Sequence, residues 1–241
     1  MLLTYVFVAL VVTAGTAAQA ASGFGFSLLT VPLLAALLDA QTAVVANGAL
    51  GLLLVAFMAV RGQGRVERSV VAVAVGAAIV GMPLGLWVLS HLGNRALTAA
   101  IGVVVLVLTV ALIRGLRLPA GRATYALAGV LSGALSTSTG TSGPPLVIAL
   151  QGIQVAAEGF RATLATLFAL QGTVAFGAFI ATGRVTAEVG RVALAGLPGL
   201  ATGWVLGDRI FRRLDERRFR RLVTGMLALS ATVAIIRSLV A

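Results

Sequence analysis

The sequence predicts an all-α polytopic membrane protein built from two homologous halves. Hydrophobic residues make up 59% of the 241 positions, charged residues make up only 10%, and the mean hydropathy is +1.07. No soluble fold has enough interior to bury this composition. Because a membrane-spanning helix needs about 20 apolar residues, the length admits about eight to ten spans with short connections and no separate soluble domain.

The first expected membrane repeat, residues 1–122, contains five apolar segments. We expect Leu2–Ala20 to be a retained span because it lacks the basic n-region of a signal peptide; cleavage is the alternative, since its AAQA ending resembles a signal-peptidase site. The second segment, Leu28–Leu38, is too short at about 11 residues to cross a membrane alone as a helix. The remaining expected helices are Thr42–Val60, Val70–Leu89 and Leu97–Ile113.

The second expected repeat, residues 123–241, has the same order of features, so we expect one transmembrane domain made of two repeats. The last helices of the halves share seven of 13 positions between residues 102–114 and 225–237, and prolines pair as Pro32 with Pro145 and Pro83 with Pro198. Its expected segments are Tyr125–Leu135, Leu146–Leu150, Ala162–Ala181, Val189–Leu206 and Leu222–Leu239.

The arginines indicate how the halves are oriented. All 18 basic residues are arginine, against seven acids, and most lie between apolar segments, which is typical of membrane topology rather than of nucleic-acid binding. If each short segment completes a crossing, 14 arginines lie on one side and four on the other; if the short segments are re-entrant, nine lie on each side. Because positive charge concentrates in the cytoplasm, the first arrangement is favoured, and it predicts inverted repeats with both termini outside.

Two polar interruptions mark the expected functional region. Residues 131–146, LSGALSTSTGTSGPPL, carry glycine, hydroxyl residues and proline between apolar segments, and residues 23–32, GFGFSLLTVP, form a weaker counterpart. We expect both to break membrane helices, because proline lacks a backbone donor and glycine favours other conformations. Broken helices persist in a membrane where they are buried in protein or line a polar cavity, so they are expected to meet near the midplane. The expected helix-break residues are Gly23, Gly25, Pro32, Gly133, Pro144 and Pro145.

The residues around these interruptions predict an anion site without a cation. Hydroxyl donors, exposed amides and the positive ends of half-helices that begin near Leu28 and Leu146 would hold a small oxyanion. The alternative is that small residues let helices pack closely and hydroxyls satisfy neighbouring backbone. Gln19, late in the first segment, is a further polar residue of interest. The candidate substrate-binding residues are Ser27, Thr30, Asn47, Ser136, Thr137, Ser138, Thr139, Gly140, Thr141, Ser142, Gly143, Thr163 and Gln171.

Two carboxylates precede the third helices of the halves, Asp39 and Glu158. A buried carboxyl group with a raised pKa could carry a proton with the anion; a solvated helix cap is the alternative role. The chain has no cysteine and one histidine, His91, which excludes disulfides, thiolate metal sites, cysteine nucleophiles and a histidine-based metal site.

The two interrupted segments, with the dipeptides VP and PP at their ends, the two-half layout and the small-residue terminal helices, resemble the TauE/SafE family of membrane permeases. The resemblance extends over essentially the whole chain. Members carry a glycine-rich stretch before the proline of each half, here residues 23–32 and 136–145. This sequence departs from the pattern with Phe24 and Phe26 in the first stretch and with hydroxyl residues in place of glycines in the second. The resemblance implies transport of sulfite and organosulfonates.

We therefore expect a secondary transporter in the bacterial plasma (inner) membrane that moves a small anion by alternating access. Sulfite, a sulfonate or a related organosulfur anion is the expected substrate; a passive anion channel or a transporter of a non-sulfur organic anion is the alternative. No nucleotide-binding motif is present, so a gradient of H⁺ or Na⁺ would supply the energy. No cofactor, nucleic-acid partner or enzymatic activity is expected, because paired acids, metal ligands and a nucleophile with its base are missing at membrane depth.

Overall fold

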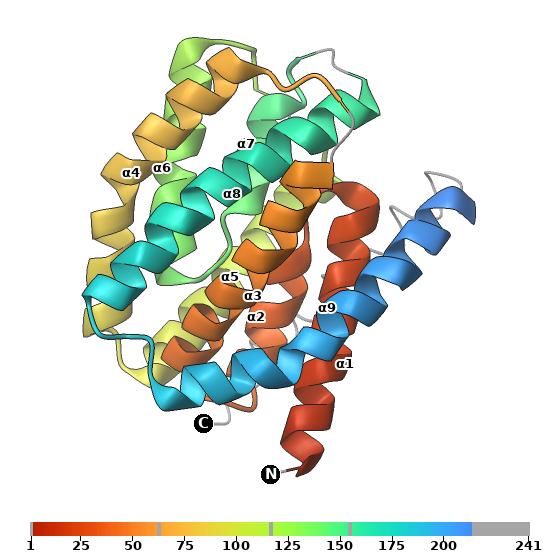
Figure 1. Cartoon of the computed structure of the whole chain (residues 1–241). Coiled ribbons are helices and arrows are strands. Elements are labelled where there is room, and N and C mark those ends of the chain that lie inside the picture. Colours follow the sequence, from red (N-terminus) through yellow and green to blue (C-terminus); the bar gives the residue numbers. More distant parts are fainter. Residues whose placement is uncertain (1, 62–63, 116–117, 154–155, 214–241) are drawn as a thin grey trace.

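The computed structural model describes residues 2–61, 64–115, 118–153 and 156–213, and within them the chain forms only helices and turns (Figure 1). The predicted all-α class is confirmed. The expected helix Leu222–Leu239 lies outside the described residues. The helices are α1 (Leu2–Ser22), α2 (Phe26–Ala35), α3 (Ala40–Arg61), α4 (Arg68–His91), α5 (Asn94–Ile113), α6 (Arg122–Ser138), α7 (Gly143–Leu150), α8 (Ala157–Ala181) and α9 (Ala187–Arg213).

Six of the described helices are long and apolar enough to cross a membrane, namely α1, α3, α4, α5, α8 and α9. Large apolar side chains cover their outer surfaces; Val60 is 87% exposed and Val80 is 73% exposed. Such a surface suits lipid rather than water. The chain is therefore a polytopic membrane protein. The helices α6, α2 and α7 are shorter, with 17, 10 and eight residues.

The second interruption is much shorter than the sequence predicts. Helix α6 continues to Ser138 and α7 begins at Gly143, so only residues 139–142 are non-helical. The expected break at Gly133 is wrong: this glycine lies inside α6, where an added Cβ would be 2.0 Å from the carbonyl oxygen of Ala78 on α4. It permits close helix packing rather than a break.

The prolines also behave differently from one another. Pro32 lies inside α2, so the expected break at this residue is wrong as well. Pro144 and Pro145 lie in the first turn of α7, where proline costs no intrahelical hydrogen bond. They therefore begin a helix after the interruption.

Helices of different halves pair closely. Glycines of α9 lie against the backbone of α1. A Cβ added at Gly199 would be 2.5 Å from the carbonyl oxygen of Ala9, and one added at Gly207 would be 2.7 Å from that of Ala17. Because the contacts advance along both helices together, α1 and α9 run in the same direction. Helices α4 and α6 pack in the same way through Gly129 and Gly133. Helix α3 crosses α8 in the opposite direction, and the three pairs make up most of the bundle in Figure 1.

The connections gather at two ends of the bundle. At the first end, the guanidinium of Arg161 donates to the carbonyl oxygen of Ala20 at 2.6 Å, and Gly64 lies against Glu158. At the second end, the amide of Ala40 donates to Asn94 Oδ1 at 2.7 Å and Arg184 donates to Gln41 Oε1 at 2.8 Å. Helices α1 and α3 both begin at the second end, so α2 returns the chain to the end where it started.

This geometry separates the described arginines. We name the first end the arginine-rich end and the second the opposite end. Because α2 returns the chain as it does, the arginines group as in the favoured sequence arrangement. The arginine-rich end holds Arg61, Arg65, Arg68, Arg114, Arg122, Arg161, Arg209, Arg212 and Arg213, and the opposite end holds Arg95, Arg184 and Arg191.

Candidate functional site

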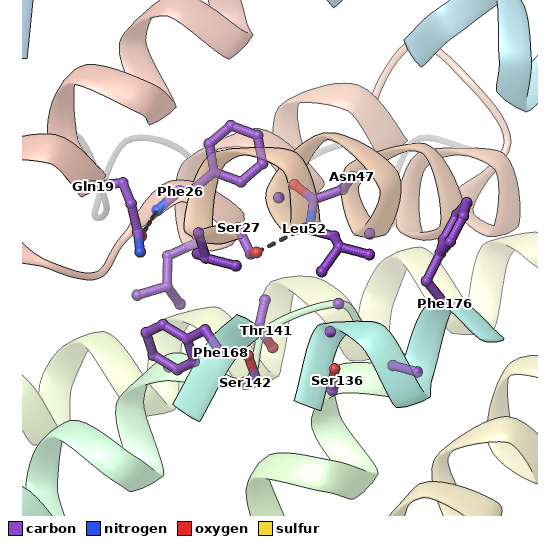
Figure 2. A pocket seen from close by; sticks show the side chains of 18 of the residues that line it. Gln19, Phe26, Ser27, Asn47, Leu52, Ser136, Thr141, Ser142, Phe168 and Phe176 are labelled. Atoms are coloured by element: carbon purple, nitrogen blue, oxygen red, sulfur yellow. Dashed lines mark hydrogen bonds between the residues drawn. The ribbon is translucent and has the colours of Figure 1, made fainter. Parts of the chain in front are cut away.

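A pocket lies where the two helix interruptions meet (Figure 2). One wall comes from the α1–α2 interruption and α3, and the other comes from the α6–α7 interruption and α8. Its volume is about 70 Å³. One water needs roughly 10–15 Å³ by the same kind of measure, so the pocket has room for a small anion or a few waters. The residues that line it in the described chain are all uncharged.

Asn47 organises the first wall. Its side chain is 2% exposed, its Nδ2 donates to the hydroxyl of Ser27 at 3.0 Å, and its Oδ1 accepts from the hydroxyl of Thr30. Ser27 and Asn47 line the pocket, whereas Thr30 stands behind them. The three predicted residues therefore form one cluster, with Thr30 in a positioning role.

Gln19 braces the first interruption. Its Oε1 accepts from the amide of Phe26 at 3.1 Å and its Nε2 donates to the carbonyl oxygen of Gly23 at 3.0 Å. Gly23 and Gly25 have φ of +83° and +108°, a backbone conformation that a side chain would strain. The first amide of α2 is thus satisfied by a side chain, and Gln19 itself lines the pocket.

The second wall is built on the turn between α6 and α7. Gly140 has φ of +68°, and the hydroxyls of Thr139 and Thr141 lie 2.7 Å apart. Thr141 and Ser142 line the pocket together with Gly140 and Gly143. Thr139, which is 2% exposed, lies behind Thr141. This turn therefore brings four predicted residues into the site.

A buried hydrogen-bond group supports this turn from below. The hydroxyl of Ser132 lies 2.8 Å from the carbonyl oxygen of Ser142 and 2.9 Å from Oε1 of Gln171, and it donates to one acceptor at a time. The Nε2 of Gln171 is buried with no hydrogen-bond partner among the described residues. Gln171 is one residue from Gly172, which lines the pocket. It is thus an uncommitted donor beside the pocket rather than in its wall.

Among the described residues, three serine hydroxyls in the pocket donate no hydrogen bond. Within this part of the chain, Ser27 only accepts one from Asn47, and the hydroxyls of Ser136 and Ser142 form none. In Figure 2, Ser27 lies on one side of the pocket, and Ser136 and Ser142 lie on the other. These hydroxyls are the available donors for a ligand.

Three predicted substrate-binding residues lie elsewhere. Thr137 donates to the Met82 carbonyl oxygen on α4 at 2.8 Å, and Ser138 donates to the Ala134 carbonyl oxygen at 2.7 Å. Thr163 accepts from the amide of Glu67 at 3.1 Å and so supports the start of α4. None of these three side chains lines the pocket. Their hydroxyls satisfy backbone groups, so the described pocket does not bring these three predicted residues into contact with a ligand.

The carboxylates Asp39 and Glu158 are exposed at opposite ends of the bundle. Asp39 accepts from the amide of Thr42 at 2.9 Å, which is the geometry of a helix cap at the start of α3. The burial on which the proton-coupling hypothesis depended is absent at both residues.

The sequence did not single out the apolar part of the site. Phe168, Phe176 and Phe179 line the pocket, as do the small residues Gly48 and Gly172 at the crossing of α3 and α8. Gly48 and Gly172 lie on the third expected helix of each half, and these glycines could have predicted this part of the site. Small residues are needed where crossing helices leave a gap.

The described residues form an all-helical polytopic fold with a neutral pocket between two interrupted helices, an arrangement that membrane transporters use for their binding sites. Residues 7–233 match the family described as Sulfite exporter TauE/SafE, and the chain belongs to this family. The chain is therefore a membrane transporter of the sulfite and organosulfur exporter type, which confirms the resemblance seen in the sequence. A search of curated proteins and a search of solved structures returned no match.

Proposed function

We propose that this chain is a secondary transporter of a small sulfur-containing anion, such as sulfite or a simple sulfonate, in a bacterial inner membrane. The observation that carries the proposal is the set of serine hydroxyls at Ser27, Ser136 and Ser142 that donate to no described residue and lie in a pocket whose described lining is uncharged. A sulfur oxyanion has several oxygens that accept hydrogen bonds, and serine hydroxyls can donate to them.

The donor set suits a ligand that must also leave. Neutral hydroxyl and amide donors bind an anion less strongly than an arginine or lysine would. Helix α7 adds little, because Pro144 and Pro145 lack amide hydrogens and leave Gly143 as its first donor. The phenylalanines Phe168 and Phe176 provide apolar surface for the carbon end of a sulfonate.

The pairing of helices supports alternating access in a protein built from inverted repeats. The first helix of each half, α1 or α6, lies along the fourth helix of the other half, α9 or α4, and the third helices α3 and α8 cross antiparallel. This is the exchange expected of two repeats related by an axis in the membrane plane. Positive charge at the arginine-rich end favours a cytoplasmic location for that end.

Phe179 is the proposed gate toward the opposite end. It is 1% exposed, it lines the pocket, and Thr182, one turn later, lines a hollow of about 490 Å³ beside Asp39 and Arg184. Movement of this ring would join the pocket to the hollow. In proteoliposomes, Phe179→Ala is expected to show an anion leak that does not saturate. The wild-type protein is expected to show saturable flux.

The test of the function is ligand-induced thermal stabilisation of the purified full chain, because a ligand bound only by the folded state raises its stability. The probes are sulfite, thiosulfate, methanesulfonate, sulfoacetate and taurine, with acetate and lactate as non-sulfur anions. The pocket variant is Ser136→Ala with Ser142→Ala. The matched control is Ser138→Ala, because this hydroxyl bonds its own helix.

We expect a shift with at least one sulfur anion in the wild type and in Ser138→Ala, and its loss in the pocket variant. A shift with carboxylates alone would indicate a non-sulfur organic anion. Flux through proteoliposomes that neither saturates nor shows counterflow would indicate a channel. No shift with any anion in folded protein would refute the proposed site.

A further inference from the structure

We infer that the pocket takes its substrate as a monoanion, so that a diprotic sulfur oxyanion is carried in its singly protonated form and brings a proton with it. This inference rests on the proposed function, since it concerns the charge of the anion held by the same pocket. It assigns the coupling proton to the substrate rather than to a side chain.

The first support is the position of every described ionisable residue on the helices that line the pocket. Helices α2 and α7 carry none. On the others, these residues lie within the first or last few positions of the helix, and none of them lines the pocket. They are Tyr5 on α1, Arg61 on α3, Arg122 and Tyr125 on α6, and Glu158 and Arg161 on α8.

Among the described residues, Arg161 is a cation whose side chain reaches the first interruption. Its side chain contacts Gly23 and donates to the Ala20 carbonyl oxygen, and Asp208 and Glu158 act on it electrostatically. It precedes Phe168 by seven residues, about 10 Å along α8. Two carboxylates therefore partly offset its charge, and Arg161 does not line the pocket.

The opposite end is balanced in a similar way. Arg184 donates to Gln41 and Ser90 and lines the outer hollow with Asp39 and Glu188. None of these residues lines the inner pocket. An anion in the described pocket thus faces neutral donors, and the described charged residues lie outside its lining.

A site of this kind discriminates by charge. The cost of taking an ion out of water grows with the square of its charge, so a dianion costs about four times as much as a monoanion of the same size. Serine hydroxyls also accept hydrogen bonds, so the O–H group of a protonated oxyanion can donate to Ser27, Ser136 or Ser142. Arginine and lysine have no acceptor for such a hydrogen bond. The described site therefore favours a protonated monoanion over its conjugate dianion.

The proton balance follows directly. The protonated anion enters the pocket on one side of the membrane and leaves on the other, where it releases its proton to water. No side chain needs to be protonated during the cycle. Exposed positions for Asp39 and Glu158 are consistent with this scheme.

The test is isothermal titration of the purified full chain over a pH series that brackets the second dissociation of sulfurous acid. The probes are fresh sulfite, methanesulfonate as a permanent monoanion, and sulfate as a dianion throughout. We expect methanesulfonate affinity to be flat with pH and sulfate not to bind. Sulfite affinity should fall about tenfold for each pH unit above that dissociation, in proportion to the protonated fraction.

A double variant, Asp39→Asn with Glu158→Gln, separates substrate protonation from protein protonation and is expected to keep the sulfite slope. Sulfite affinity independent of pH, or sulfate binding as tight as methanesulfonate, would overturn the inference and leave the transporter proposal standing. Loss of the slope in the double variant would also overturn it. If none of the three anions binds at any pH, both the inference and the proposed function fail.

Discussion

Gly133→Ala provides a quantitative test of the helix packing. The added Cβ would lie 2.0 Å from the carbonyl oxygen of Ala78, against at least 3.4 Å for an ordinary contact. The two helices would have to separate by 3.4 − 2.0 = 1.4 Å at this point. Because the neighbour is backbone, no side-chain rotation can relieve the overlap.

Overpacking of this kind costs about 1–3 kcal/mol, and alanine in place of glycine returns about 0.5–1 kcal/mol of helix propensity. The matched control is Gly76→Ala on α4, where an added Cβ meets nothing within 4 Å. It gains the propensity without the overlap. The difference between the two variants in unfolding free energy should therefore be about 1–3 kcal/mol.

The assay is reversible unfolding of both variants in mixed detergent micelles, followed by far-ultraviolet circular dichroism. We expect Gly133→Ala to unfold at lower denaturant than the wild type and Gly76→Ala to unfold at the same or higher denaturant. Equal stability of the two variants would mean that α4 and α6 do not approach as described, and the packing argument would be wrong.

Three further substitutions separate binding from support. Asn47→Leu removes the donor to Ser27 and the acceptor for Thr30, so we expect a loss of about 1–3 kcal/mol in unfolding free energy and at least tenfold weaker anion binding by titration. Gln19→Leu leaves the amide of Phe26 without its partner, and both thermal stability and binding should fall. Thr163→Val should lower the unfolding free energy by about 1–2 kcal/mol with unchanged binding, because this hydroxyl serves the α3–α4 connection. A binding defect in Thr163→Val would contradict this division.

The sequence predicted the helices well where length and hydropathy decide. The short α2 and α7 were expected from segments too short to span, and the structure keeps them short. The error lay in α6, which was expected to end near Leu135 but continues to Ser138. In a membrane-embedded helix, hydroxyls bond carbonyls of the preceding turn, as Ser138 does with Ala134, so a run of serine and threonine need not interrupt it.

The site was predictable by region but not by residue. Both interruptions line one pocket, yet the adjacent hydroxyls of Ser136 and Thr137 point to different surroundings, the pocket and Met82 on α4. The sequence alone does not distinguish these two hydroxyls. Their directions depend on where α6 ends and on the helix that packs beside it. Gln19 required the same knowledge, since its partner Phe26 lies across a turn whose geometry two glycines determine.

The packing also predicts which bodies move. The pairs α1–α9 and α4–α6 meet at glycines where an added Cβ would be 2.0–2.7 Å from backbone oxygens, so these pairs cannot slide without separating. At the α3–α8 crossing, a Cβ added at the glycines would meet side chains instead. At Gly172 it would lie 3.3 Å from Cδ1 of Leu52. We therefore expect movement at this crossing and not between the two halves as sequence units.

Cysteine pairs test this expectation, since the natural chain has no cysteine to interfere. The Cβ positions at Leu52 and Gly172 lie 3.8 Å apart, and those at Ala77 and Gly129 lie 3.0 Å apart, so the first pair matches a disulfide and the second needs about 0.5 Å of adjustment. Oxidation of Leu52→Cys with Gly172→Cys should stop transport, and reduction should restore it. Oxidation of Ala77→Cys with Gly129→Cys should leave transport intact, because that pair belongs to one rigid body. The opposite pattern would place the moving interface between α4 and α6.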